Sequence, residues 1–127
     1  MNIRRANEKD IPRLIELLGQ VLQIHADIRP DIFIAGTTKY TNEELSEMIK
    51  DDTNPIYVAA DENDVCMDAS ARGQHIGEAL FEYVKSEAKR LGCYEVTLNV
   101  WTGNTSAEKF YEKMGLKTKE RQMEYIL

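Results

Sequence analysis

The sequence is poor in cysteine, proline and tryptophan, and it contains no long hydrophobic run. Its only cysteines, Cys66 and Cys93, are too few for a disulfide framework and fit a reducing, cytoplasmic setting. No apolar stretch approaches the roughly 20 residues that a membrane-spanning helix needs. The opening segment, residues 1–7, lacks the apolar region of a secretory signal peptide. These absences predict a cytoplasmic protein without a membrane partner.

Positive charge is also scarce. The chain has 16 Lys and Arg against 22 Asp and Glu, a net charge of −6, and no run of five basic residues. Because affinity for nucleic acid comes from neutralising phosphates, this balance argues against a nucleic-acid partner. It favours a cationic partner such as an amine, although an acidic surface also serves solubility alone. The length of 127 residues predicts one domain, residues 1–127.

Hydrophobic periodicity and capping signals divide the chain into helices and strands. Asn7 or Asp10 can cap the first helix, Thr41 begins a capping box for the second, and Thr105 begins one for the last. The predicted helices span residues 11–22 (with Pro30 as the outer limit), 42–53, 76–91 and 105–114, and the predicted strands lie at residues 4–6, 56–60, 65–67, 96–100 and 123–126.

This order, β-α-α-β-β-α-β-α-β, predicts an α/β protein with a mixed sheet. Residues 66–100 form a strand–helix–strand unit, so we expect its two strands to be parallel with a right-handed crossover. A ligand would then bind at the carboxyl end of the first strand, as in other α/β sheets.

The glycine loop at residues 72–77 is the most informative motif. Arg72-Gly73-Gln74-His75-Ile76-Gly77 leads directly into a helical pattern, so backbone N–H groups and the helix dipole can hold a phosphate or pyrophosphate. No Gly-Lys-Ser/Thr follows, which excludes a Walker A loop. A dinucleotide-binding Rossmann loop is disfavoured, because the motif lies past mid-chain and Glu95 stands at a strand start.

Several motifs together resemble the GNAT N-acetyltransferase superfamily. Residues 71–80 resemble its Arg/Gln-x-x-Gly-x-Gly/Ala acetyl-CoA loop, and residues 99–107 its strand-to-helix junction. Residues 110–116 resemble its Phe-Tyr-x-x-x-Gly-Phe signature, and residues 3–12 look like a typical opening. The resemblance covers nearly the whole chain and implies the GNAT fold.

Two features depart from the family pattern. His75 stands where the family usually has glycine, so a Cβ must fit in the loop. Residues 64–68 replace two full strands: Asp64-Val65 resembles the start of the earlier one and Cys66-Met67-Asp68 the end of the later one. Either the sequence omits a disordered segment here, or the chain has a true internal deletion. We favour the first reading, because losing central strands exposes sheet edges. It predicts Cα atoms of Val65 and Cys66 well beyond the ~3.8 Å of a trans peptide.

The resemblance implies direct transfer of an acetyl group from acetyl-CoA to an amine, with no metal and no acyl-enzyme, so neither cysteine need be a nucleophile. Similar proteins bind the cofactor with backbone groups, which here implies pyrophosphate contacts from Arg72, Gly73, Gln74, His75, Ile76 and Gly77 and pantetheine contacts from Cys66 and Met67. Asn104 would bond the pantetheine arm, or it would only start a helix.

Tyr111 matches the position of the family's general acid. A phenol with a pKa near ~10 is protonated at neutral pH and can protonate the leaving thiolate. The alternative is a core aromatic, because Phe110, Tyr111 and Met114 fit one helical face. No residue is assigned as general base. The acceptor-facing segment would be Leu22–Tyr40, which includes His25, Asp27, Asp31 and Phe33.

Three function classes remain open at this point. The first is an N-acetyltransferase acting on a primary amine of a small molecule or peptide. The second is a GNAT-fold module that binds acetyl-CoA or CoA without turnover, and the third is an unrelated nucleotide-binding domain. A homodimer is common in the family.

Overall fold

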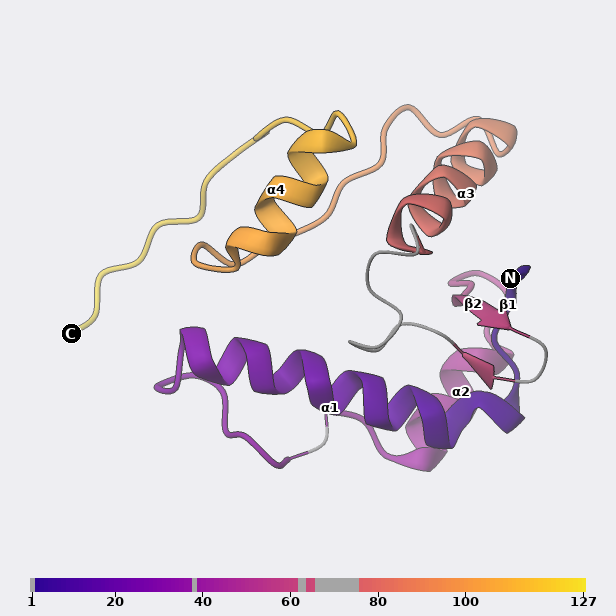
Figure 1. Ribbon diagram of the computed structural model, residues 1–127, viewed down its shortest axis with the longest axis horizontal. Helices are drawn as coiled ribbons and strands as arrows, with labels where there is room; N and C mark the ends of the chain where they lie inside the picture. Colours follow the sequence, from indigo (N-terminus) through magenta and orange to yellow (C-terminus); the bar gives the residue numbers. More distant parts are fainter. Residues whose placement is uncertain (1, 38, 62–63, 66–75) are drawn as a thin grey trace.

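The computed structural model describes residues 2–37, 39–61, 64–65 and 76–127. Three strands, four α-helices and one 3-10 helix are formed in this part of the chain (Figure 1). In chain order they are β1 (Asn2–Arg5), η1 (Glu8–Asp10), α1 (Ile11–Ile28), α2 (Asn42–Lys50), β2 (Tyr57–Asp61), β3 (Asp64–Val65), α3 (Ile76–Arg90) and α4 (Thr105–Lys113).

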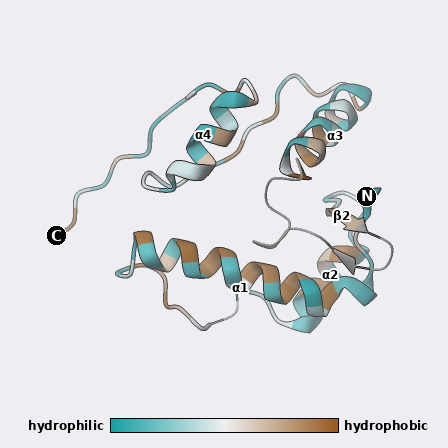
Figure 2. Cartoon of the chain, viewed as in Figure 1, coloured by the Kyte–Doolittle hydropathy of each residue, from teal (hydrophilic) through white to brown (hydrophobic). Residues whose placement is uncertain are grey.

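The strands form one antiparallel sheet in the order β1-β2-β3. Ile3 pairs with Ala59, and Ala60 pairs with Val65. The apolar stripe of α1 is visible along its length in Figure 2, and α1 and α2 pack beside the sheet. The buried apolar residues therefore gather mainly at this end of the molecule: Ala6, Ile11, Ala26, Leu45, Val58, Ala59, Ala60 and Ile76.

The turn between β1 and α1 is held by a buried carboxylate. Asp10 is 5% exposed, and its two oxygens accept hydrogen bonds from the Arg4 guanidinium at 2.7 and 2.9 Å. Its Oδ2 also accepts from the backbone N–H of Asn7 at 2.8 Å, while Asn7 Oδ1 accepts from the N–H of Lys9. Of the two residues predicted to cap the first helix, Asn7 caps η1, the turn that leads into α1. The Asp10 side chain makes no capping hydrogen bond to α1 and instead fixes the start of the helix to β1 through Arg4.

The predicted helices are confirmed, with one correction at a cap. Thr41 and Glu44 form the predicted capping box of α2. Gly92 follows α3 with φ 79° and Gly115 follows α4 with φ 95°, the left-handed conformation that makes glycine the usual residue after a helix. The prediction that Thr105 caps α4 is wrong: Asn104 is the cap, since its Oδ1 accepts from the N–H of Ala107 at 3.4 Å.

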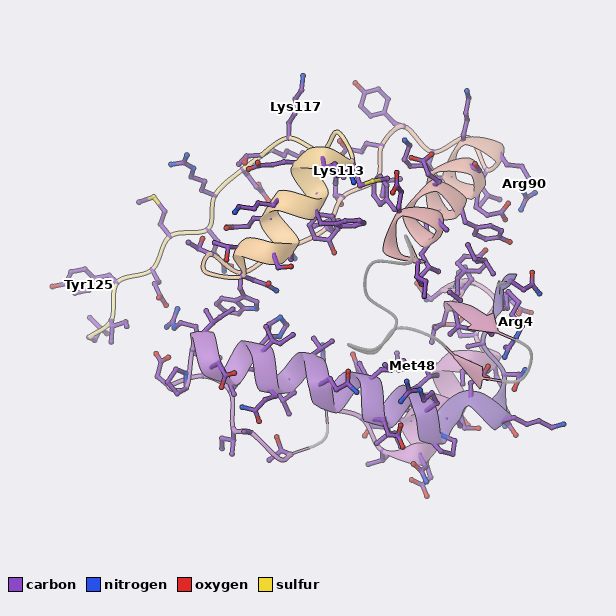
Figure 3. All side chains as sticks on the ribbon, viewed as in Figure 1. Arg4, Met48, Arg90, Lys113, Lys117 and Tyr125 are labelled. Atoms are coloured by element: carbon purple, nitrogen blue, oxygen red, sulfur yellow. The ribbon has the colours of Figure 1, made fainter. Side chains whose placement is uncertain are left out.

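The strands predicted at residues 96–100 and 123–126 are not formed, so these two predictions are wrong. Both segments lack regular secondary structure, and apolar residues in them stay exposed: Leu98 is 37% exposed and Tyr125 is 88% exposed. Figure 3 shows the Tyr125 side chain pointing outward from the C-terminal segment. A strand requires a neighbouring strand for its hydrogen bonds, and within the described residues the sheet ends at the two-residue β3.

The predicted pair of parallel strands is therefore not observed in the described residues. Its second strand, residues 96–100, is not formed, and Cys66 and Met67 of its first strand lie outside the described residues. The predicted Cα separation between Val65 and Cys66 also falls outside them and stays a prediction. No helix in the described part of the chain combines the length and apolar character needed to cross a membrane.

Candidate active site

The predicted acetyl-CoA loop enters the described residues only at its last two positions. Six of the predicted binding residues lie outside them: Cys66, Met67, Arg72, Gly73, Gln74 and His75. Ile76, buried at 5% exposure, begins α3, and Gly77 is the second residue of that helix. The first turn of α3, with the positive end of the helix dipole, therefore lies where the predicted loop ends.

Gly77 joins the beginning of α3 to α4. A Cβ built on Gly77 would lie 3.3 Å from Cζ of Phe110, closer than side chains ordinarily approach. Glycine at this position therefore makes room for the Phe110 ring. The sequence predicted Gly77 as the last residue of the pyrophosphate-binding loop, and the structure adds this packing role.

Tyr111 follows the residue that makes this contact. Its ring lies 5.3 Å from the Phe110 ring, centroid to centroid and nearly edge to face, and the residue is half-buried. α4 thus places the Tyr111 phenol beside the aromatic ring that contacts the first turn of α3. The predicted general acid and the last residue of the predicted cofactor loop belong to one packed unit.

Asn104 performs the helix-starting role that the sequence left as an alternative. Its side-chain oxygen caps α4, and its backbone N–H donates to the carbonyl of Trp101 at 3.1 Å. Capping uses only the amide oxygen, so the side-chain NH2 group keeps two donors that are not needed for the cap. Binding of the pantetheine arm by Asn104 stays a prediction.

Aromatic rings gather where the end of α1 meets the turn before α4. His25 lies 5.2 Å from Phe33 and 6.4 Å from Trp101, and Phe33 meets Trp101 edge to face at 5.4 Å. All three residues are half-buried. We call His25, Phe33 and Trp101 the aromatic cluster. A Cβ on Gly103 would lie 3.2 Å from Ile28, so the turn packs tightly against α1.

The Arg29 guanidinium lies over one ring of the aromatic cluster, that of Trp101. The Arg29 guanidinium carbon lies 5.9 Å from the centre of the Trp101 ring. Its nitrogens donate to Asp31 at 3.0 and 2.9 Å and to Glu124 at 2.6 and 3.3 Å. The hydrogen bonds from Arg29 hold the pKa of Asp31 below its usual value, so this carboxylate is ionised at neutral pH.

The sequence anticipated only part of this arrangement. His25, Asp31 and Phe33 lie in the segment predicted to face the acceptor, and the structure brings them together. Trp101 and Glu124 were missed, because they are about 70 and 90 residues further along the chain. One signal in the sequence could have indicated Trp101 as a site residue: it stands directly before the turn that leads to Asn104.

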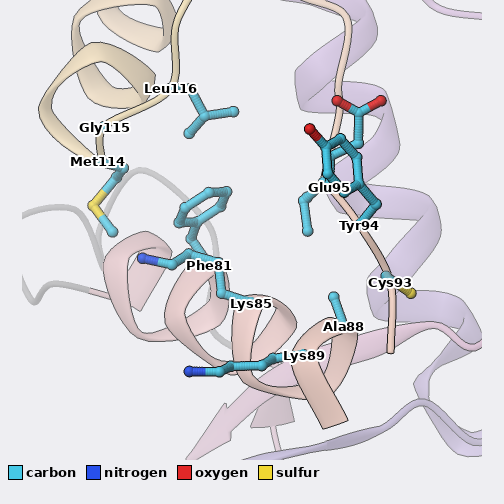
Figure 4. Close-up of a pocket in the computed structure, with 11 residues that line it drawn as sticks. Phe81, Lys85, Ala88, Lys89, Cys93, Tyr94, Glu95, Met114, Gly115 and Leu116 are labelled. Carbon is cyan, nitrogen blue, oxygen red and sulfur yellow. The ribbon is translucent and has the colours of Figure 1, made fainter. Parts of the chain in front are cut away.

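A separate hollow of about 390 Å³ lies between the later turns of α3 and the residues that follow α4 (Figure 4). Phe81, Lys85 and Lys89 line it from α3, and Met114 and Leu116 line it from the other side. None of the predicted site residues borders it. Among the described residues, no group of three or more His, Cys, Asp and Glu is arranged to hold a metal ion.

Comparison with known proteins identifies the family. The model of the acetyltransferase (GNAT) family matches residues 48–116, which include α3, Asn104 and Tyr111. The chain belongs to the GNAT acetyltransferase family. This match confirms the family to which the motifs pointed.

Two curated relatives differ in what they acetylate. A glucosamine 6-phosphate N-acetyltransferase from Arabidopsis thaliana is 37% identical over 60 residues, which cover 47% of this chain and 38% of the relative. The peptidyl-lysine N-acetyltransferase YjaB from Salmonella typhimurium is 28% identical over 136 positions, which cover 95% of this chain and 86% of the relative. The chain thus spans well under half of the plant relative.

The YjaB alignment also bears on the shortened segment. It is longer than the 127-residue chain itself, so YjaB has residues without a counterpart here. If residues are missing between Val65 and Cys66, a longer GNAT protein must contain residues that this chain lacks, as YjaB does.

Solved structures confirm the fold. A mutant of the BH1408 protein from Bacillus halodurans has a TM-score of 0.93 at 23% identity, covering 100% of this chain and 99% of that one. A putative acetyltransferase from Agrobacterium tumefaciens has a TM-score of 0.72 at 20% identity, covering 100% of both chains. The GNAT fold predicted from the motifs is therefore present.

Proposed function

We propose that this GNAT protein is an acetyl-CoA-dependent N-acetyltransferase that transfers the acetyl group directly to a primary amine of a small molecule or peptide. The observation that carries the proposal is the contact between Gly77 and Phe110. It joins the end of the predicted cofactor loop to the helix that bears Tyr111, within the segment that matches the family.

Acetyl-CoA would be held mainly by backbone groups. N–H groups of Arg72, Gly73, Gln74, His75, Ile76 and Gly77 would bind its pyrophosphate at the positive end of the α3 dipole. The pantetheine arm would run along Cys66 and Met67 and accept a bond from the Asn104 amide. This arrangement would direct the thioester toward Tyr111.

The reaction then needs a neutral amine as nucleophile, a base that removes the proton of the amine, and an acid for the leaving thiolate; no residue of the chain is assigned as the base. The neutral amine nitrogen attacks the thioester carbonyl, the C–N bond forms, and the C–S bond breaks. The departing thiolate takes the phenolic proton of Tyr111, while the proton lost by the amine passes to solvent. Backbone N–H donors beside the thioester oxygen would stabilise the tetrahedral intermediate by about 3–4 kcal/mol.

Replacing Tyr111 tests the proposal. Tyr111→Phe keeps the ring that packs beside Phe110 but removes the acid, so turnover should fall by ~10²-fold or more while acetyl-CoA binding persists. CoA release with a panel of polyamines, amino sugars and lysine peptides measures turnover, and calorimetry measures binding. Tyr94→Phe is the matched control, because Tyr94 is 99% exposed. Unchanged turnover in Tyr111→Phe would remove this phenol from the mechanism.

A module that binds acetyl-CoA without turnover is the second candidate, favoured by the unpaired segment at residues 96–100. Acetyl-CoA at ~100-fold excess over its Kd should then stabilise the fold by about 2.7 kcal/mol with no CoA release from any amine. Stabilisation by ATP or NAD instead would contradict both candidates. We also propose a homodimeric assembly, which size-exclusion chromatography with light scattering can test, and a cytoplasmic location, which cell fractionation can test.

A further inference from the structure

We propose that the aromatic cluster, with the carboxylates of Asp31 and Glu124, binds the non-reacting end of the acceptor, and that this end is cationic rather than phosphorylated. The inference rests on the proposed function and names the acceptor class: amines that carry a second positive charge, such as polyamines.

The position of the cluster suits an acceptor subsite. Trp101 precedes the turn that ends in Asn104, the cap of α4, and Tyr111 lies on that same helix. The helix rises roughly 9 Å between Thr105 and Tyr111, at about 1.5 Å per residue. A molecule of several bonds could therefore reach the cluster with one end while its reacting amine stays near the phenol.

The charge of the cluster selects the class of ligand. Arg29 is one cation shared by two carboxylates, so the group of Arg29, Asp31 and Glu124 carries a net charge of −1. Four hydrogen bonds already occupy most of the five N–H donors of this guanidinium. A phosphate would find few free donors here and would face both carboxylates, whereas an ammonium group would be attracted.

The exposure of these groups leaves them accessible to a ligand. The side chains of Asp31 and Glu124 are 53% and 56% exposed, so each has an oxygen surface open to solvent. The three rings are half-buried, which leaves part of their surface uncovered. The Trp101 ring already engages the Arg29 cation at 5.9 Å, the type of contact that an acceptor ammonium would make with an aromatic face.

Tryptophan fluorescence tests the inference without any turnover. Trp101 is the only tryptophan in the chain, so a change in emission reports on the cluster itself. Spermidine titrated at constant ionic strength, with no acetyl-CoA present, should change the emission saturably. Glucosamine 6-phosphate at the same concentrations should not. An equal or stronger response to glucosamine 6-phosphate, or no saturable response to spermidine, would overturn the inference.

Charge variants separate a local site from general attraction to an acidic protein. Glu124→Gln and Asp31→Asn should each weaken the spermidine response about fivefold. Glu120→Gln removes the same charge from an exposed position four residues before Glu124 in the chain and should leave the response unchanged. Equal weakening by all three variants would show general attraction and would contradict the inference.

Kinetics then distinguish this inference from the proposed function. Trp101→Ala should raise the KM for spermidine about tenfold and leave the KM for acetyl-CoA unchanged. A spermidine response without CoA release supports the subsite and contradicts the proposed function. CoA release that is insensitive to Trp101→Ala supports the function and contradicts the subsite.

Discussion

At the scale of single residues, two side chains hold the chain at points where elements meet. Asp10 ties α1 to β1 through Arg4, and Arg29 ties the end of α1 to Asp31 and Glu124. These ion pairs differ in burial. Asp10 is almost fully buried, whereas the partners of Arg29 are about half exposed, so the first should contribute more to stability.

We expect the Asp10 ion pair to make stability depend on pH. Hydrogen bonds from Arg4 and from the Asn7 backbone hold the folded-state pKa of Asp10 below its usual value. Its contribution is therefore complete above the unfolded pKa of about 3.9 and is lost as the pH falls through the folded pKa. Asp10→Asn should lower the free energy of unfolding by about 2 kcal/mol at pH 7 and flatten its decline below about pH 5.

Urea unfolding at several pH values measures both effects. Asp52→Asn is the control, since Asp52 bonds Arg5 from an exposed position, with its side chain 88% exposed. The same loss at pH 7 and pH 3 in Asp10→Asn would show that the carboxylate charge does not stabilise the fold.

Asn104 allows its two roles to be separated by substitution. Asn104→Ser keeps an oxygen that can cap α4 but removes the amide donors, so stability should change by only a few tenths of a kcal/mol. If the amide binds the pantetheine arm, the Kd for acetyl-CoA should rise about two- to tenfold. Calorimetry measures the Kd. An unchanged Kd would leave Asn104 as a helix cap alone.

At the scale of elements, α3 and α4 are positioned by one close contact. Gly77 lies at the beginning of α3, where a side chain would press on Phe110. Glycine is less favourable than alanine in a helix by about 1 kcal/mol, but at this position it allows the two helices to approach closely. The contact brings α4, the helix that carries Tyr111, against the first turn of α3.

A double-mutant cycle should separate these two effects. Gly77→Ala should destabilise the protein when Phe110 is present, because the ring must shift to accept the methyl group. In a Phe110→Ala background the same substitution should stabilise it by up to about 1 kcal/mol through helix propensity. Chemical denaturation measures all four proteins. The same effect of Gly77→Ala in both backgrounds would show that the two residues are not coupled.

At the scale of the whole molecule, buried residues are distributed unevenly among the described helices and strands. The sheet, α1 and α2 contain most of the buried residues, whereas no residue of α4 is fully buried. The segments on either side of α4 are joined to each other by the ion pair between Lys119 and Glu95 at 2.5 Å. The apolar side chains at residues 123–127 remain largely exposed.

Hydrogen exchange should follow this division. Backbone amides of residues 96–100 and 123–126 lack sheet partners and should exchange at rates close to those of an unstructured chain. Amides of β2, which pairs with both neighbouring strands, should exchange slowest. Mass spectrometry of peptic fragments resolves these segments. Slow exchange at residues 96–100 would show that a strand pairs there in solution.

Local sequence signals predicted most of the helices and the family. Thr41, Gly92 and Gly115 act on the backbone within a few residues, so the ends of helices could be predicted from them. The motifs at residues 71–80 and 110–116 were sufficient to indicate the GNAT family, because they combine residue types and spacing within short segments. The same signals failed at residues 96–100, where the alternating pattern is correct for a strand but the pairing partner is lacking.

The sequence by itself determined the helices, the capping box of Thr41 and the glycines that follow α3 and α4, since these depend on neighbours in the chain, and its motifs indicated the family. Only the tertiary structure decided which alternating segments became strands, why Gly77 carries no side chain, and that Trp101 and Glu124 join Arg29. Contacts between residues separated by tens of positions depend on how the helices pack, and no local pattern records that packing.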